Sequence, residues 1–283
     1  MKISVIIPTY NRWPLVCRAI DSVLAQSRPA DQVIVVDDGS TDDSVRQLLQ
    51  HYSHRINVLQ QANSGVSAAR NNGIQQATGD WIALLDSDDE WLPEKLSHQE
   101  RIIAEQRDAV LCHTDEIWIR NGIRVNPMKK HSKHGGNIFL NCLPLCAISP
   151  SSALIKKETL TKVGMFDESL PACEDYDLWL RICSRHEVLF IPEAQLIKYG
   201  GHDDQLSRKY WGMDRFRIQA LKKLLDSETL SNIQRDHTIQ MLVKKTRILH
   251  KGACKHRNVE LAEYCNTLLQ QYRNSSPETD NPC

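Results

Sequence analysis

The sequence predicts an α/β fold built on a parallel sheet. The first observation behind this prediction is a rhythm over residues 1–108, where short apolar runs of strand length alternate with amphipathic stretches of helical length. Such alternation is typical of βαβ units. The second is composition: 41% of the 283 residues are hydrophobic, enough to bury a sizeable core.

The elements follow one another in chain order. Strands are predicted at 3–8, 32–37, 56–61 and 81–86, and helices at 13–25, 41–50, 64–78 and after Pro93. Proline suits a first helical turn because its missing N–H would have no partner there. Beyond residue 109 the rhythm changes. The pattern then predicts a longer half-exposed strand at 109–119, a basic surface loop at 121–137, a strand and short helix within 151–166, and a helix at 174–185.

The C-terminal part is helical in pattern from residue 212 to 272, and the polar tail 274–283 is expected to be disordered. A helical stripe of Ile239, Leu242, Thr246 and Leu249 should pack on the rest of the chain or on a second copy in a homodimer. Residues 222–257 hold nine Lys/Arg and three Asp/Glu. A basic amphipathic helix can lie on anionic lipid, and an ordinary solvated face is the alternative.

Composition narrows the function classes. Thirty-five Lys+Arg balance 35 Asp+Glu, so the total charge does not indicate nucleic acid as a partner. The nine cysteines form no CxxC pair, which favours reduced thiols in a cytoplasmic protein over a zinc ribbon or a disulfide framework. The N-terminus does not resemble a signal peptide, and the longest apolar runs are of strand length.

Acidic residues gather at the ends of two predicted strands. The strand at 32–37 ends in Asp37-Asp38, and the strand at 81–86 leads into "DSDD" with Asp86, Asp88 and Asp89. Because ligands of parallel sheets bind beyond the carboxyl ends of the strands, these side chains should line one site. Carboxylates there can accept hydrogen bonds from a base or ribose, or hold a hard divalent cation. Without a cation or hydrogen-bond donors they would repel one another.

Some polar residues near these strand ends have a purely structural explanation. Asp42, Asp43 and Asp89 are expected to be helix caps or parts of solvated turns. Ser40 and Thr41 are expected to cap the helix that follows them.

Familiar nucleotide and hydrolase motifs are missing from the sequence. It contains no GxGxxG, no GxxxxGK[ST] and no GxSxG. These absences argue against a dinucleotide dehydrogenase, a P-loop nucleotidase and the usual serine hydrolase. A nucleotide site built from acids rather than glycines needs a metal ion to offset the phosphate charge.

Six motifs occur in this order: "VIIPTYNR", "VIVVDDGSTD", "NSGVSAARNNGI", "LLDSDDEWLPEKL", "FDESLPACEDYDLWLR" and "YGGHDDQLS". Together they resemble the family 2 glycosyltransferases over residues 1–210. The resemblance implies a GT-A-like Rossmann-type mixed sheet flanked by helices, as a catalytic domain over 1–211. Its nucleotide-binding half would cover 1–108 and its acceptor half 109–211. A helical extension would follow at 212–273.

The resemblance also implies the ligands. Family members bind a nucleotide-sugar, usually a UDP-sugar, together with Mg²⁺ or Mn²⁺. The positions that match the nucleotide site are Pro8, Thr9, Tyr10, Asn11, Asp38, Arg70 and Asp86. In this match Asp38 receives the base and Asp37 orients its loop. Asp88 of the DxD motif is the implied metal ligand, with Asp86 and His202 as further implied contacts.

The motif "EDYD" contains the implied catalytic base, Asp175, with Glu174 as a supporting neighbour. A carboxylate in the first turn of a helix is stabilised as an anion by the helix dipole. An ordinary N-terminal cap is the alternative role for Asp175. The implied activity is inverting transfer of a sugar to an acceptor hydroxyl. The implied setting is bacterial-type assembly of surface glycans or glycoconjugates, with lipid-linked acceptors and contact with the inner face of the membrane.

Two other functions remain open. A non-catalytic nucleotide-sugar binding protein would keep Asp38 and Asp88 but would need no base, and the intact "EDYD" speaks against it. A nucleotidyltransferase on a related fold would need a glycine-rich phosphate loop near the N-terminus, and "PTYNRW" is not one.

Overall fold

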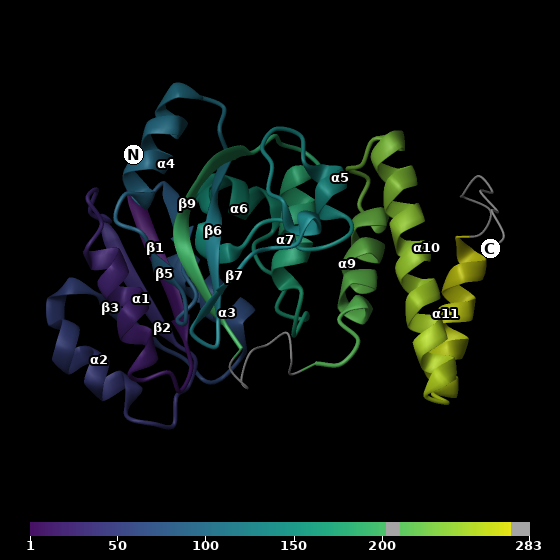
Figure 1. Cartoon of the computed structure of the whole chain (residues 1–283), viewed down its shortest axis with the longest axis horizontal. Helices are drawn as coiled ribbons and strands as arrows, with labels where there is room; N and C mark the ends of the chain where they lie inside the picture. The colour runs from purple at the N-terminus through teal and green to yellow at the C-terminus, as the bar shows by residue number, and fades with distance from the viewer. Residues whose placement is uncertain (202–209, 273–283) are drawn as a thin grey trace.

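A computed structural model describes residues 1–201 and 210–272. In this part of the chain nine strands form one sheet in the order β3-β2-β1-β4-β8-β6-β9-β5, with β7 paired to β6. Figure 1 shows helices on both sides of this sheet and three C-terminal helices at the far end of the molecule. The α/β mixed sheet flanked by helices is therefore confirmed.

The first half of the sheet is parallel. Its strands are β1 (Ile3–Thr9), β2 (Gln32–Asp37), β3 (Asn57–Gln60) and β4 (Trp81–Leu84). The helices between them are α1 (Leu15–Leu24), α2 (Ser44–Tyr52) and α3 (Val66–Gln76). β1 and β4 are buried along their whole length, which explains why both read as unbroken apolar runs rather than as alternating ones.

The second half of the sheet mixes directions. β8 (Leu154–Lys156) is antiparallel to β4 and to β6 (Leu111–Arg120), β6 is parallel to β9 (Leu189–Gly200), and β5 (Glu90–Trp91) is antiparallel to β9. The helical elements are α4 (Lys95–Glu105), α5 (Phe139–Cys142), η3 (Pro150–Ser152), α6 (Lys157–Val163) and α7 (Glu174–Cys183). Helix α4 begins two residues after Pro93.

The segment predicted as a plain loop at 121–137 contains a strand. β7 (Ile123–Val125) pairs with the end of β6 across the turn Asn121-Gly122, whose φ angles are 49° and 76°. Asn-Gly is the residue pair that a two-residue hairpin favours, because both positions need positive φ. The apolar pattern missed β7 because Ile123 is 69% exposed and packs into no core.

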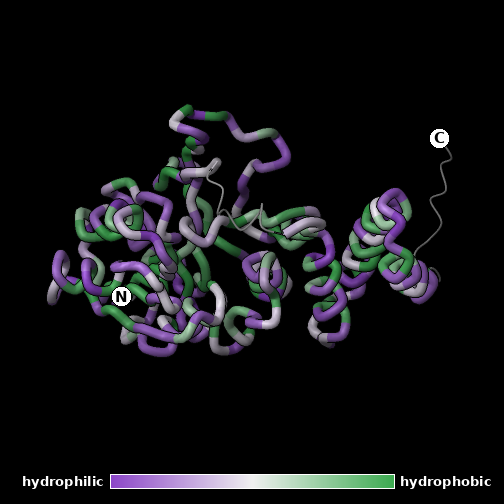
Figure 2. Tube along the Cα trace, turned by 90° about the horizontal axis from the view of Figure 1, so that it is seen from below, coloured by the Kyte–Doolittle hydropathy of each residue, from purple (hydrophilic) through white to green (hydrophobic). Residues whose placement is uncertain are grey.

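The apolar side chains of the parallel strands divide between the two faces of the sheet. Val5 and Ile7 belong to the core that includes α1, while Ile6 belongs to the core that includes α3 and α7. Figure 2 shows hydrophobic stretches alternating with hydrophilic ones in the sheet half and also in the C-terminal helices. Helix α3 lies so close to β1 that a Cβ on Gly73 would come within 2.5 Å of Ile6 Cγ2. This close approach fixes the position of the residues that α3 carries.

The C-terminal helices are α9 (Asp214–Asp226), α10 (Asn232–Lys255) and α11 (Val259–Gln271). Helix α9 packs against α7, and α10 packs against both α9 and α11 (Figure 1). The predicted stripe is buried: Leu242 and Thr246 are fully covered. Lys223 of α9 also pairs with Asp167 at 2.6 Å and with Asp177 at 3.1 Å.

Three sequence predictions concern membrane-spanning helices, the C-terminal tail and the domain boundary. None of the helices in the two described ranges is both long enough and apolar enough to cross a membrane. The predicted tail at 274–283 lies outside the described residues. The division at residue 211 into a catalytic domain and an extension stays a prediction, although α9 begins at Asp214.

Candidate active site

The ends of β1 and β2 present two buried oxygens. Pro8 and Thr9 are buried, whereas Tyr10 is 45% exposed. Thr9 lies directly beside Asp37 across the parallel pair. Asp37 Oδ2 accepts the N–H of Ser40 at 3.0 Å. Within the described part of the chain, Thr9 Oγ1 and Asp37 Oδ1 have no hydrogen-bond partner, and buried polar atoms of this kind call for a water or a ligand.

Asn11 joins the loops that follow β1 and β2. Its N–H donates to Ser40 Oγ at 2.8 Å, and its Oδ1 accepts the N–H of Thr41 at 2.8 Å. The predicted capping role of Ser40 and Thr41 is therefore wrong, since both hydroxyl residues bind Asn11 and α2 has Asp43 at its N-cap. Asp42 Oδ1 accepts the first N–H of α2, which agrees with the structural role predicted for Asp42 and Asp43.

Asp38 holds the loop in front of α3. Its carboxylate accepts three hydrogen bonds: from Gln61 Nε2 at 2.8 Å, from the N–H of Ser64 at 2.9 Å and from the N–H of Gly65 at 2.8 Å. A carboxylate offers about four acceptor positions, so about one remains for another donor. Reading of a base by Asp38 stays a prediction.

Arg70 connects the two halves of the sheet. Its side chain is 3% exposed, and it reaches Asp86 Oδ1 through Nη2 and Glu174 Oε1 through Nη1, both at 2.7 Å. Burial would raise the pKa of Asp86, but the charge and hydrogen bond of Arg70, together with the charges of Lys198 and Arg12, outweigh it and the net shift is downward. Burial raises the pKa of Glu174. The resemblance implied that Arg70 contacts the nucleotide; in the structure it bridges the DxD loop and the "EDYD" helix.

Hydrogen bonds from η3 and β9 hold the DxD loop in place. Ser151 Oγ accepts the N–H of Asp86 at 3.1 Å and donates to Asp89 Oδ2 at 2.7 Å, and Asp89 Oδ1 accepts the N–H of Tyr199 at 3.2 Å. Asp89 is 1% exposed, and its burial raises its pKa well above the usual range. The prediction that Asp89 lies in a cap or solvated turn is therefore wrong.

Asp88 lies on the same loop, at the surface of the site. Its carboxylate is 3.4 Å from Arg12 Nη1 and its side chain is 21% exposed. Its backbone carbonyl accepts Arg18 Nη2 at 2.6 Å, and the Arg18 guanidinium stacks 3.6 Å from the centroid of the Tyr199 ring. Two arginines from the α1 side thus fix the position of Asp88.

Lys198 of β9 is a site residue that the sequence analysis missed. Its ammonium donates to Ser149 Oγ at 3.1 Å. Burial would lower the pKa of Lys198, but the charges of Glu116, Asp89 and Asp86 outweigh it and raise the pKa. A single lysine in a strand pattern gives no local signal of this role, because the acids around it come from distant parts of the chain.

Asp175 lies in the first turn of α7. Its Oδ1 accepts the N–H of Tyr176 at 2.7 Å, and its Oδ2 accepts the thiol of Cys146 at 3.0 Å. The N-cap position belongs to Cys173, which makes no side-chain cap bond. Asp175 is therefore not the N-cap residue, and its half-buried carboxylate faces the segment that precedes η3. No local pattern in the sequence indicated Cys146, which lies 29 positions before Asp175.

Two of the three predicted metal ligands lie within the described residues. Asp86 and Asp88 lie on one loop and offer hard carboxylate oxygens, which suit Mg²⁺ or Mn²⁺. In the described ranges no three His, Cys, Asp or Glu side chains form a group that could hold a metal ion. His202 lies outside those ranges. The eight cysteines in the described residues are free thiols.

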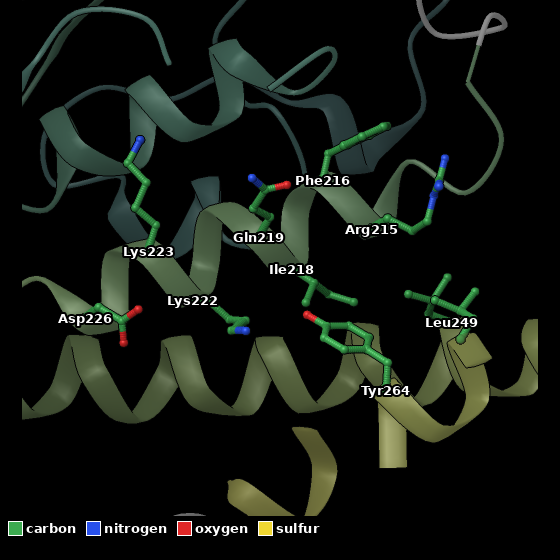
Figure 3. Close-up of a pocket in the computed structure, with 10 residues that line it drawn as sticks. Arg215, Phe216, Ile218, Gln219, Lys222, Lys223, Asp226, Leu249 and Tyr264 are labelled. Carbon is green, nitrogen blue, oxygen red and sulfur yellow. The ribbon is translucent and has the colours of Figure 1, made fainter. Parts of the chain in front are cut away.

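A cavity of about 500 Å³ lies away from the strand ends, between α9 and the α10–α11 pair (Figure 3). Its lining includes Arg215, Lys222, Lys223, Asp226, Leu249 and Tyr264. Lys223 is already paired with Asp167 and Asp177, and Lys222 lies 5.6 Å from the centroid of the Tyr264 ring. This cavity shares no lining residue with the carboxylate site.

The parallel strands, the acid-rich loop after β4 and the carboxylate on α7 define a glycosyltransferase of the GT-A type. The sequence profile described as "Glycosyl transferase family 2" matches residues 4–164, and one described as "Glycosyltransferase like family 2" matches residues 130–258. The chain belongs to glycosyl transferase family 2.

Curated bacterial relatives agree with this assignment. An uncharacterized glycosyltransferase of Rickettsia typhi is 30% identical over 285 residues, covering 98% of this chain and 85% of that protein. One of Nostoc sp. is 48% identical over 175 residues, covering 59% of this chain and 54% of that protein. One of Rickettsia felis is 32% identical, and the chain spans only 35% of its length. The chain thus corresponds to about a third of some relatives and to most of others.

Solved structures match the fold. S. aureus TarS 1–349 in complex with UDP-GlcNAc has a TM-score of 0.74 and 21% identity, covering 98% of this chain and 82% of that one. The same protein in complex with UDP has a TM-score of 0.62 and 20% identity, covering 100% and 94%. At this identity the likeness shows the fold, and it confirms the GT-A-type sheet.

The Arg70 bridge gives a stability prediction. Arg70→Met leaves Asp86 and Glu174 without their shared cation, and loss of one partner from a buried ion pair costs about 3–5 kcal/mol. Adding Glu174→Gln should recover part of this loss. Arg46→Met is the matched control, because it removes an exposed arginine from its pair with Asp43. Urea unfolding of the four proteins is the measurement; a wild-type midpoint for Arg70→Met would contradict the bridge.

Proposed function

We propose that this family 2 glycosyltransferase moves a sugar from a UDP-sugar to an acceptor hydroxyl with inversion at the anomeric carbon. The observation that carries the proposal is the Arg70 bridge. It holds the DxD loop, which suits a donor diphosphate, at a fixed distance from the α7 turn that carries Asp175. A site for transfer needs these two groups on opposite sides of one reacting carbon.

The donor pocket is assigned to the ends of β1 and β2. Thr9 Oγ1 and Asp37 Oδ1 are buried and lack partners in the described structure, and Asp38 keeps about one acceptor position. Such oxygens suit the N–H and hydroxyl groups of a nucleoside. The choice of uridine is supported by the UDP-GlcNAc and UDP complexes of the TarS neighbours.

Mg²⁺ or Mn²⁺ is proposed as the cofactor, held by Asp88 and Asp86. Divalent ions of this kind are often bound by one or two carboxylates together with substrate phosphates. When bound, the ion would act as a Lewis acid toward the leaving diphosphate. Lys198 adds a fixed positive charge beside Asp86 and Asp89.

Asp175 is proposed as the general base. It takes the proton of the acceptor hydroxyl while the acceptor oxygen forms a bond to the anomeric carbon. The bond from that carbon to the diphosphate oxygen breaks at the same time, and its electron pair leaves with UDP. One base and in-line attack invert the anomeric configuration, through an oxocarbenium-like transition state. A protein that only binds nucleotide-sugars, or a nucleotidyltransferase, would not need this carboxylate.

Contact with a membrane surface through α10 is also proposed, for glycan assembly at the inner face. Lys244, Arg247 and Lys251 are exposed on α10, and Ile248 between them is 55% exposed. The basic face is narrower than the sequence suggested, because Lys245 is buried. Its ammonium donates to the carbonyl of Pro144 at 2.9 Å and to Asp214 Oδ1 at 3.0 Å.

The metal assignment predicts the behaviour of Asp88→Ala. Wild type should bind UDP more tightly with Mn²⁺ than without, because the ion offsets the repulsion between carboxylates and diphosphate. Asp88→Ala should lose this Mn²⁺ dependence, while Asp42→Ala, on a neighbouring loop, should keep it. Isothermal titration with UDP measures both. Retention of full Mn²⁺ dependence in Asp88→Ala would refute the assignment.

The base assignment predicts the behaviour of Asp175→Asn. The amide keeps the size of the side chain but cannot take up the proton, so transfer should fall by about 10²–10⁴-fold. Affinity for UDP and Mn²⁺ should change little, because a base acts mainly in the transition state. Release of UDP from UDP-GlcNAc, UDP-glucose and UDP-galactose, with water as acceptor, is the measurement. Near-normal turnover would place the base elsewhere and favour a test of Glu174 or Asp177.

The membrane surface predicts salt-dependent binding to lipid. Wild type should sediment with vesicles that contain phosphatidylglycerol and should be released by salt, because exposed charges are screened. Lys244→Glu/Arg247→Glu/Lys251→Glu should not sediment, and exposed Lys129→Glu/Lys130→Glu on the β6–β7 side should sediment like wild type. Absence of wild-type binding at low salt would make this face an ordinary solvated one. Dimers without lipid would assign it to a second copy of the chain.

A further inference from the structure

The thiol of Cys146 touches the proposed base. Cys146 is half-buried in the segment between α5 and η3, and its Sγ lies 3.0 Å from Asp175 Oδ2. The same sulfur lies 3.2 Å from the carbonyl oxygen of Ile148. Asp175 Oδ1 accepts the N–H of Tyr176. Each oxygen of the carboxylate is therefore held by a donor from a different part of the chain.

The thiol is in the protonated form that this contact requires. Burial raises the pKa of Cys146 well above that of an ordinary thiol, and the charge of Asp175 raises it further. At neutral pH the sulfur therefore carries its proton and donates it toward the carboxylate. A thiolate at 3.0 Å would instead repel the anion.

The segment that carries Cys146 is also tied to the donor side of the site. Ser149 accepts a hydrogen bond from Lys198, and Ser151 binds both the N–H of Asp86 and the carboxylate of Asp89. Residues 146–151 thus connect the DxD loop with the base. Through Cys146 this connection reaches the carboxylate oxygen itself, rather than only the helix that bears it.

We propose that Cys146 is a positioning residue: its thiol holds Asp175 Oδ2 so that the carboxylate faces the acceptor hydroxyl. The inference rests on the proposed role of Asp175 as the base. A thiol is a weak donor. It can therefore orient the carboxylate without stabilising the anion as strongly as a hydroxyl or an ammonium would, and a strongly hydrogen-bonded carboxylate is a weaker base.

The test compares three variants in UDP release from the UDP-sugar that wild type hydrolyses fastest. Cys146→Ala should lower kcat about two- to tenfold, the range of one net hydrogen bond, with KM for the donor unchanged. Cys146→Ser keeps a donor that orients the carboxylate, so it should lower kcat less than Cys146→Ala does; a small loss is expected because the stronger hydroxyl donor makes the carboxylate a weaker base. Cys142→Ala is the matched control, because its buried thiol lies four positions earlier and makes no bond to Asp175. It should leave kcat unchanged.

A double-mutant cycle separates positioning from packing. If Cys146 acts through Asp175, then Cys146→Ala should cost little further in the Asp175→Asn background, because contacting residues that act together are not additive. Equal losses in both backgrounds, or a loss in Cys146→Ser as large as in Cys146→Ala, would overturn the inference. If Cys146→Ala had the wild-type kcat while Asp175→Asn was inactive, the inference about Cys146 would be overturned and the proposed function would stand. A fully active Asp175→Asn would overturn the proposed function first.

Discussion

The buried guanidinium of Arg70 is the interaction on which the site depends. It joins α3, the loop after β4 and the start of α7, three segments that no backbone hydrogen bonding of the sheet would place together. Arginine suits this role because its planar fork can satisfy two carboxylates at once, whereas a lysine ammonium is a point charge on a flexible stem. The close packing of Gly73 against Ile6 fixes the position of α3 relative to β1, and therefore the position of the Arg70 side chain. Packing in the core thus determines geometry at the surface.

The parallel half and the mixed half of the sheet contribute to the site in different ways. The parallel strands carry polar residues to one edge of the sheet, where Thr9 Oγ1 and Asp37 Oδ1 have no hydrogen-bond partner among the described residues. The mixed half of the sheet lies beside the DxD loop. Lys198 and the N–H of Tyr199, both on β9, interact with acidic residues of that loop. A displacement of the DxD loop relative to α7 would break the bonds of Arg70 to Asp86 and Glu174. This rigidity is what a reaction with a demanding in-line geometry needs.

Most of the parallel half was predictable from the sequence, since apolar runs of strand length alternate there with helical stretches. The motif residues at its edge were predictable too, because strand ends are where ligands bind. The burial of individual side chains at the site was not predictable. Asp89 looked like a turn residue and Lys245 like a surface cation, yet both are buried because partners far along the chain, Ser151 and Asp214, satisfy them. No local pattern encodes such pairs, and the same reason hid Cys146.

The charges of the site explain why a donor and a divalent ion should enter together. Among the described residues, six carboxylates and four cations lie close together in the site: Asp86, Asp88, Asp89, Glu116, Glu174 and Asp175 with Arg12, Arg18, Arg70 and Lys198. Burial is the main cause of the raised pKa of Asp89 and Glu174, and the charges of neighbouring carboxylates raise both further. A diphosphate would add to the negative charge, and Arg12 and Arg70 are already paired with carboxylates. A divalent ion on Asp88 would offset this negative charge at the point where the leaving group gains charge. The charges of the described residues therefore favour the proposed divalent ion at Asp88.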